Sequence, residues 1–327
     1  MFAAIVSQQN PRVKNAARLR ESRVRRREGL FLIDGVREAA RAWERGFEFV
    51  EVFWNAGKNV AADEKVDVDA ALSAVRARAG KSERDADAVE KRFDDLRTLL
   101  KTVDAAGVPT IPLSTGAFEK IGFGERDEAV VAVVRAKTTT LDALDSLLTA
   151  KSEKTGEAPL IAVIEGVEKP GNVGAILRSA DGAGLDALIV AAPDFDLFNP
   201  NAIRSSLGAI FSVPTVVAAA PDVLAWLRRR KIQRATALCD DSIPYPQLDY
   251  RRPTAIVLGS EADGLTEIWA SETPEDAADG LLQKARLPML GIADSLNVSN
   301  AAAVFFYEAR RVRSLDAENR AVAEKRR

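Results

Sequence analysis

The chain has 327 residues, 47% of them hydrophobic and 29% charged, and its formal net charge is −2. That length suits about two globular domains. No apolar run is long enough to span a bilayer and the first residues do not resemble a secretion signal, so we expect a cytoplasmic protein. The sequence contains no histidine and one cysteine, Cys239. These counts exclude a Ser-His-Asp triad, a Cys-His pair, a histidine-ligated metal site and an internal disulfide, and we expect Cys239 in the core.

Positive charge is concentrated at the start of the chain. Residues 1–30 contain eight basic and two acidic side chains, a local net charge of +6 in an otherwise acidic protein. Such a segment can neutralise several phosphates of a nucleic acid. A solvated helix face is the alternative interpretation.

The amino-terminal part alternates short apolar runs with helical patterns. We expect a helix over 36–45 and strands over 29–33, 49–54, 110–113 and 129–135. These elements predict a small α/β domain over 1–138. An Ala-rich, highly charged insertion at about 59–101 is expected to form helices or an extended segment, and the sequence suggests no function for it.

The carboxy-terminal part has the rhythm of a parallel sheet. After a polar segment at 139–157, which we interpret as a linker, five short apolar runs follow at 160–164, 187–191, 214–217, 234–238 and 255–258. Helical or loop segments separate them, which is typical of an α/β sheet with helices on both faces. A closing helix is expected over 300–313 and a charged tail over 316–327.

Two glycine-containing segments differ from the phosphate-binding motifs that they superficially resemble. Gly166 to Gly171 resembles a phosphate loop, but Asn172 and Val173 follow where Lys and Ser or Thr are required. Gly182 to Gly184 precedes a predicted strand instead of following one, the reverse of a dinucleotide fingerprint. We therefore expect this segment to end a helix, with a glycine in the left-handed conformation before the strand.

Three segments carry a family resemblance. Residues 165–184, 256–265 and 287–302 resemble, in order and spacing, motifs 1, 2 and 3 of the SpoU (TrmH) family of RNA 2′-O-methyltransferases. Residues 199–211 are similar to the loop that follows the second strand of that domain. The resemblance implies a methyltransferase domain of the SPOUT type over 158–315, an α/β parallel sheet with a deep trefoil knot.

The resemblance also implies S-adenosylmethionine as the methyl donor. The positions that match the family's cofactor site are Gly259, Leu287, Met289, Ser295 and Leu296. Glycine at 259 permits close backbone approach, and Leu287 and Met289 offer an apolar wall for adenine. Plain core packing is the alternative for those two apolar residues. No metal is expected.

The candidate catalytic residues are Arg178, Asn172, Glu261, Ser295 and Asn297. The resemblance implies that Arg178 lies beside the target ribose. Because the pKa of arginine exceeds about 12, we expect Arg178 to hold a phosphate and orient the 2′-hydroxyl and not to act as an ordinary base. A surface ion pair is the alternative for Arg178, and turn or cap roles are the alternatives for the amide and hydroxyl residues.

The amino-terminal region resembles the substrate-binding domain of SpoU enzymes that modify large-subunit ribosomal RNA. We expect RNA contacts from Arg18, Arg20, Arg23, Arg25, Arg26 and Arg204. Methyl transfer to a ribose of 23S-type ribosomal RNA is the predicted function, and family resemblance implies a homodimer joined through the knotted domain. A transfer RNA substrate and a catalytically silent RNA-binding or ribosome-assembly protein are the alternatives. The acidic connection at 266–286 is longer than the family's compact one.

Overall fold

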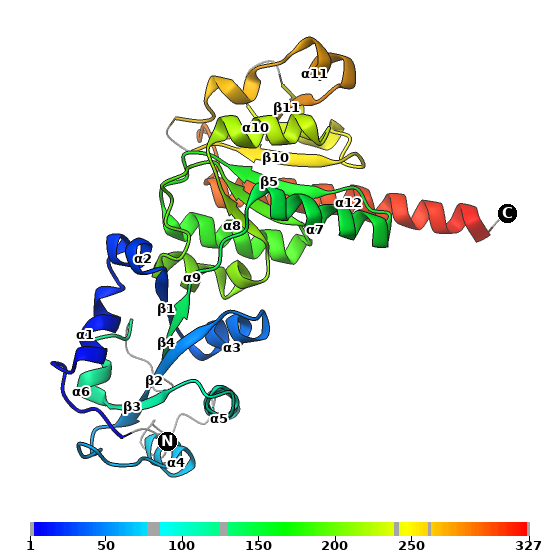
Figure 1. The fold of residues 1–327 in the computed structure, drawn as a ribbon. Helices are drawn as coiled ribbons and strands as arrows, with labels where there is room; N and C mark the ends of the chain where they lie inside the picture. The colour runs from blue at the N-terminus through cyan, green and yellow to red at the C-terminus, as the bar shows by residue number, and fades with distance from the viewer. Residues whose placement is uncertain (1–2, 77–85, 124–129, 239–241, 261–262, 326–327) are drawn as a thin grey trace. The chain divides into compact units, whose positions relative to one another are not determined.

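The computed structural model describes residues 3–76, 86–123, 130–238, 242–260 and 263–325. The chain divides into two compact units. Unit 1 comprises Met1–Lys137 and Phe198–Phe211, and unit 2 comprises Thr138–Leu197 and Ser212–Arg327. Figure 1 follows the chain through both units by colour.

Unit 1 contains a four-stranded mixed sheet with the strand order β1-β4-β2-β3. Strand β4 is antiparallel to both of its neighbours, whereas β2 and β3 are parallel. All four predicted strands are confirmed: β1 (Leu30–Asp34), β2 (Phe49–Gly57), β3 (Thr110–Ser114) and β4 (Val130–Arg135).

Two groups of helices accompany this sheet (Figure 1). The first is α1 (Pro11–Arg18), α2 (Ser22–Glu28) and α6 (Thr115–Phe118), whose apolar residues form one core cluster with Leu32, Phe53 and Val131 of the strands. Asn10 starts α1, because its side chain accepts a hydrogen bond from Arg12 N at 2.9 Å. The second group is α3 (Val36–Glu44), α4 (Val68–Arg76) and α5 (Ala86–Ala105).

The predicted insertion at 59–101 is largely helical where it is described, as expected. It supplies α4 and most of α5. Asp69 of α4 forms ion pairs of 2.9 Å with both Arg97 and Lys101 of α5. Apolar residues of α5, including Leu96 and Leu100, are buried. This part of the insertion therefore belongs to the fold of unit 1.

Unit 1 also includes a segment from the middle of the carboxy-terminal half of the chain. Helix α9 (Pro200–Ser206) lies in it, between Phe198 and Phe211. The ring of Phe198 stacks on Phe31 with 4.2 Å between centroids, and Phe211 lies 6.2 Å from Phe31. Aromatic packing thus places this segment against β1. The predicted domain boundaries, 1–138 and 158–315, had assigned the segment to the carboxy-terminal domain.

Unit 2 is built on a seven-stranded, entirely parallel sheet with the order β7-β6-β5-β10-β8-β11-β9. The five predicted runs are confirmed as strands. Two further strands were missed, one because its sequence, LQKAR, is polar and the other because it is only two residues long. The strands are β5 (Leu160–Ile164), β6 (Ala187–Val190), β7 (Thr215–Val217), β8 (Gln233–Ala237), β9 (Ile243–Pro244), β10 (Thr254–Leu258) and β11 (Leu282–Arg286).

Helices pack on both faces of this sheet, as predicted. Helices α7 (Leu141–Thr155) and α10 (Ala220–Arg229) share one core cluster with alternate strand residues such as Ile161 and Val163. Helix α8 (Pro170–Ala183) contacts α12 (Val298–Lys325), where Arg310 Nε donates to Ala183 O at 2.9 Å. The predicted helix end at Gly182 to Gly184 is confirmed, and Gly184 is the glycine that ends α8, at a φ of +69°.

Two expectations about helices were wrong. The segment 139–157 is not a linker, because it forms α7 and buries Leu144 and Leu148 at helical spacing in the core. Helix α12 does not end near 313 but continues to Lys325, so most of the predicted tail is helical.

The long connection at 266–286 is a folded part of unit 2. It contains a 3₁₀ turn (Glu267–Ala270), α11 (Pro274–Asp279) and β11. Trp269 is fully buried, and Asp276 lies 2.8 Å from Arg228 Nη2 and 3.1 Å from Arg234 Nη2.

The trefoil knot remains a prediction, because the strand order shows which strands are neighbours and does not show how the chain is threaded. No helix in the described part of the chain combines the length and apolarity of a membrane span.

Candidate active site

A cavity of about 260 Å³ lies at the carboxyl ends of β8, β10 and β11 in unit 2. Its lining includes all the predicted cofactor residues, Gly259, Leu287, Met289, Ser295 and Leu296. Sequence reasoning missed other lining residues, among them Leu238, Leu258, Arg286, Asp294 and Phe305. Leu238 and Leu258 could have been found, because ligands bind outside the carboxyl ends of parallel strands and these residues end or follow predicted strands.

The loop after β10 forms one wall of the cavity through an unusually close backbone approach. A Cβ atom at Gly259 would lie 2.2 Å from Gly264 C and 2.6 Å from Leu265 N. Ser260 and Gly264 exchange two backbone hydrogen bonds of 3.1 Å, which close the loop. Gly259 does permit a close approach, as expected, but the structure places its own loop there. Glu261, a predicted catalytic residue, lies outside the described residues.

Motifs 1 and 3 meet through two asparagines. Asn172 lies in the first turn of α8 and Asn297 immediately precedes α12. Asn297 Nδ2 donates to Asn172 Oδ1 at 3.3 Å, and Asn297 Oδ1 accepts from Ser299 N at 3.0 Å. Ser295, on the same loop as Asn297, lines the cavity. The structure therefore brings Asn172 and Asn297 together beside the cofactor cavity.

Arg178 lies on α8, six residues after Asn172 and about 9 Å further along the helix axis. Its side chain is exposed and forms no hydrogen bond or ion pair with any described residue. The alternative of a surface ion pair therefore has no support in the described structure. No described residue occupies the guanidinium donors, which leaves them available to an external anion.

The loop that carries motif 3 exposes large apolar side chains. Leu290 and Ile292 are 98% and 105% exposed, although the same loop lines the cavity through Met289 and Ser295. Full exposure of two neighbouring aliphatic side chains beside a candidate site is typical of a surface that a partner covers.

The basic arm of unit 1 divides into exposed and structural arginines. Arg18, Arg20, Arg23 and Arg26 are exposed, and the Arg20 guanidinium lies 4.5 Å from the centre of the Phe123 ring. Arg25 is only 4% exposed, and its Nη1 donates to the carbonyls of Leu19 and Arg20 at 2.7 Å. The prediction that Arg25 binds RNA is therefore corrected, because this side chain is committed to the fold.

Arg204, the remaining predicted RNA contact, is on α9 of unit 1. Its Nη1 donates to Phe123 O at 3.1 Å. One bond leaves most of the guanidinium donors available.

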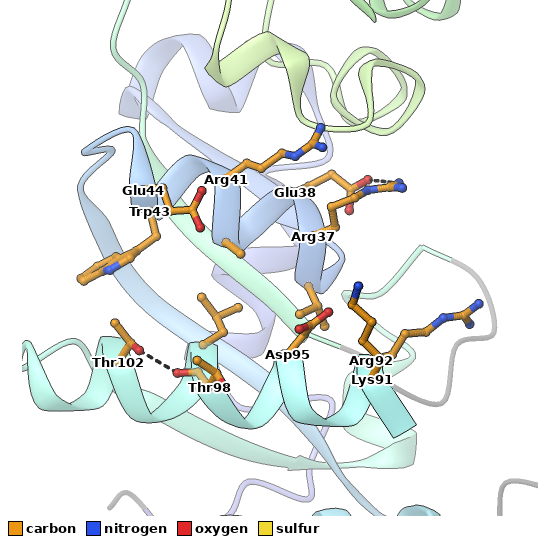
Figure 2. A pocket seen from close by; sticks show the side chains of 13 residues that line it. Arg37, Glu38, Arg41, Trp43, Glu44, Lys91, Arg92, Asp95, Thr98 and Thr102 are labelled. Atoms are coloured by element: carbon orange, nitrogen blue, oxygen red, sulfur yellow. Dashed lines mark hydrogen bonds and ion pairs between the residues drawn. The ribbon is translucent and has the colours of Figure 1, made fainter. Parts of the chain in front are cut away.

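A second cavity, of about 970 Å³, lies between α3 and α5 of unit 1 (Figure 2). Its lining mixes both signs of charge, with the cations Arg37, Arg41, Lys91 and Arg92 and the acids Glu38, Glu44 and Asp95. Arg37 is already paired with the buried Glu38 at 2.8 Å. Carboxylates at this density oppose phosphate binding, so the cavity is a poorer RNA site than the basic arm.

No metal site accompanies these features in the described residues, where His, Cys, Asp and Glu form no group of three or more able to hold an ion. Cys239 lies outside the described residues, so its predicted place in the core stays a prediction.

The backbone contact at Gly259 generates a testable prediction. We expect Gly259→Ala to weaken S-adenosylhomocysteine binding by roughly tenfold or more, because the added methyl forces the Gly264 backbone away and reshapes the cavity wall. Gly291→Ala is the matched control, since no atom lies within 4 Å of a Cβ there. Isothermal calorimetry measures both, and equal affinities for the two variants would contradict the prediction.

Sequence and structure comparisons agree on the family. The SpoU rRNA Methylase family profile matches residues 159–307, and an MRM3-like substrate binding domain matches residues 10–85. The 23S rRNA (uridine(2479)-2′-O)-methyltransferase of Streptomyces viridochromogenes is 30% identical over 66% of this chain and 71% of its own length. The 23S rRNA (guanosine-2′-O-)-methyltransferase RlmB of Ralstonia nicotianae is 31% identical over 69% of this chain and 86% of its own length.

Among solved structures, the SpoU methyltransferase AviRb from Streptomyces viridochromogenes in complex with the cofactor AdoMet is 27% identical with a TM-score of 0.67. The match covers 93% of this chain and 98% of that one. With the cavity, the asparagine pair and the parallel sheet, these matches establish that the chain belongs to the SpoU rRNA methylase family and carries an MRM3-like substrate-binding domain at its amino-terminal end.

Proposed function

We propose that this chain is a cytoplasmic enzyme that transfers a methyl group from S-adenosylmethionine to a ribose 2′-hydroxyl of large-subunit ribosomal RNA. The observation that carries the proposal is the cavity that gathers every predicted cofactor residue, next to the contact between Asn297 and Asn172. The RNA specificity follows the two relatives, both named as 23S rRNA methyltransferases.

The cavity has the chemistry that S-adenosylmethionine requires. Leu287, Met289 and Phe305 give it an apolar wall suited to adenine, and Asp294 and Ser295 supply polar groups on the motif 3 loop. The cofactor supplies a methyl group on a sulfonium centre, which an oxygen nucleophile displaces in line. The protein's task is therefore to hold the ribose oxygen opposite that methyl group.

Arg178 is the residue that we assign to the ribose side of the site. Arginine side chains are cations in proteins near neutral pH, so a guanidinium is not an ordinary base. We propose that Arg178 binds a phosphate of the substrate bidentately and orients the 2′-hydroxyl, whose proton leaves to phosphate or solvent. Asn172, Asn297, Ser295 and Glu261 remain the proposed partners that hold the cofactor, the ribose or Arg178.

The discriminating experiment is transfer of labelled methyl groups. Purified protein is incubated with labelled S-adenosylmethionine and, separately, ribosomal and transfer RNA, and the modified nucleoside is mapped. We expect a 2′-O-methylated nucleoside in large-subunit RNA. Label in transfer RNA alone would transfer the proposal to that substrate. The absence of both methyl transfer to any RNA and cofactor binding would identify a silent RNA-binding protein.

Arg178→Ala tests the assigned role. We expect at least a hundredfold loss of transfer, on the order of the loss seen when one transition-state contact is removed, with S-adenosylhomocysteine affinity unchanged within about threefold. Arg229→Ala is the control, because Arg229 is an exposed arginine on α10, which packs with the opposite face of the sheet. Parallel loss of transfer and of cofactor affinity would show that Arg178 has a structural role.

The exposed arginines of the basic arm are proposed to contact RNA phosphates. Replacing both Arg23 and Arg26 with Ala should lower RNA affinity and reduce the slope of log affinity against log salt by roughly 1 per lost contact. Fluorescence anisotropy over a salt series measures the slope, with Arg229→Ala as the control. A slope equal to that of the unaltered protein would remove the arm from the RNA interface.

We propose a homodimer formed through unit 2, in which a second copy covers Leu290 and Ile292. Sedimentation should show a dimer, and Ile292→Asp should shift it toward monomer by placing a charge in an apolar contact. Leu147→Asp is the control, because Leu147 is 52% exposed on α7 and carries no predicted contact. A monomeric parent protein at working concentration would refute the dimer.

A further inference from the structure

The carboxyl end of β5 carries a buried carboxylate. Glu165 follows the last residue of β5 and is 9% exposed. No lysine or arginine in the described chain forms an ion pair with it. A buried carboxylate without a cationic partner is costly unless hydrogen bonds compensate it.

The compensating hydrogen bonds come from one residue far along the chain. Glu165 Oε2 accepts from Thr266 N at 2.8 Å, and Glu165 Oε1 accepts from Thr266 Oγ1 at 2.9 Å. Both carboxylate oxygens are thus committed to Thr266. The backbone of Glu165 makes a third contact, since its N–H donates to Leu258 O at 3.0 Å.

These three contacts hold both ends of the same loop. The chain leaves β10 at Leu258 and returns at Thr266, and the loop between them includes Gly259, Ser260 and Gly264 of the cavity lining. The next residue after Glu165 touches the loop as well, because a Cβ at Gly166 would lie 3.2 Å from Ser260 Cβ. Glu165 therefore fixes where the loop starts, where it ends and how it meets motif 1.

We infer that Glu165 is a positioning residue for methyl transfer, which acts by holding Gly259, Ser260 and Gly264 where they line the cofactor cavity. This inference rests on the proposed function. The Glu165 side chain forms its hydrogen bonds with Thr266 and not with the lining residues Leu287 and Met289. It therefore acts on the cofactor site through Thr266. Its contribution is geometry, and its negative charge is not required.

A comparison of two substitutions separates geometry from charge. Glu165→Ala removes both acceptors and should weaken S-adenosylhomocysteine binding by roughly tenfold to a hundredfold. Glu165→Gln is uncharged but can accept from Thr266 N through its carbonyl oxygen and donate its amide N–H to Thr266 Oγ1, so affinity should stay within about threefold of the parent. An equal loss in both variants would overturn the inference and assign the role to the charge.

Thr266 provides an independent test from the other side of the contact. Thr266→Val loses the hydroxyl bond and should weaken binding, whereas Thr266→Ser keeps the hydroxyl and should match the parent. In the Glu165→Ala background, Thr266→Val should add at most about a twofold further loss, because the contact is already gone. Fully additive losses would contradict a shared interaction.

The readouts keep this inference distinct from the proposed function. Calorimetry of S-adenosylhomocysteine binding needs neither RNA nor turnover, and the kcat of the variants at saturating S-adenosylmethionine should change less than their affinity. A parent protein that binds no cofactor would refute the proposed function. A parent that binds, with a folded Glu165→Ala variant that binds equally well, would refute the positioning role alone. If Glu165→Ala does not fold, as judged by circular dichroism, the Gln, Val and Ser variants decide the question.

Discussion

The parallel pairing of β5 with β10 is the constraint on which the site of this protein depends. The two strands run in register from Leu160 beside Thr254 to Ile164 beside Leu258, so motifs 1 and 2 leave the sheet at the same edge. Every contact between those motifs follows from that placement, including the hydrogen bonds of Glu165 and the approach of Gly166 to Ser260. Because both strands consist of buried apolar residues, a shift in their register would be energetically unfavourable.

The second requirement is that motif 3 returns to the start of motif 1, and α12 satisfies it. Packing of α12 against α8 places Asn297, just before one helix, beside Asn172 in the first turn of the other. The motif 3 loop thereby borders both the cofactor cavity and the helix that carries Arg178. Helix packing and strand pairing together convert three distant segments into one site.

Local patterns predicted the buried strands and missed the elements whose stability comes from tertiary contacts. Leu160–Ile164 is apolar throughout and reads as a strand in isolation, whereas Leu282–Arg286 is polar and becomes a strand only because β8 is beside it. Helix α7 resembled a linker because few of its residues are buried. Arg25 looked like every other arginine of the arm, and only the folded chain brings carbonyls to it. Motif resemblance located the cofactor wall but gave no weight to Glu165, since its partner Thr266 is a nonlocal one.

The absence of histidine explains why such positioning contacts matter here. Without a side chain that exchanges protons near neutral pH, the protein must obtain its rate from alignment of the ribose oxygen with the methyl group. Alignment is sensitive to small displacements, so the backbone that lines the cavity must resist them. A buried carboxylate that binds Thr266 twice supplies that resistance, and its desolvation is offset by hydrogen bonds that a looser loop would not make. Rigidity of the loops therefore substitutes, in this fold, for the reactive side chain that the sequence lacks.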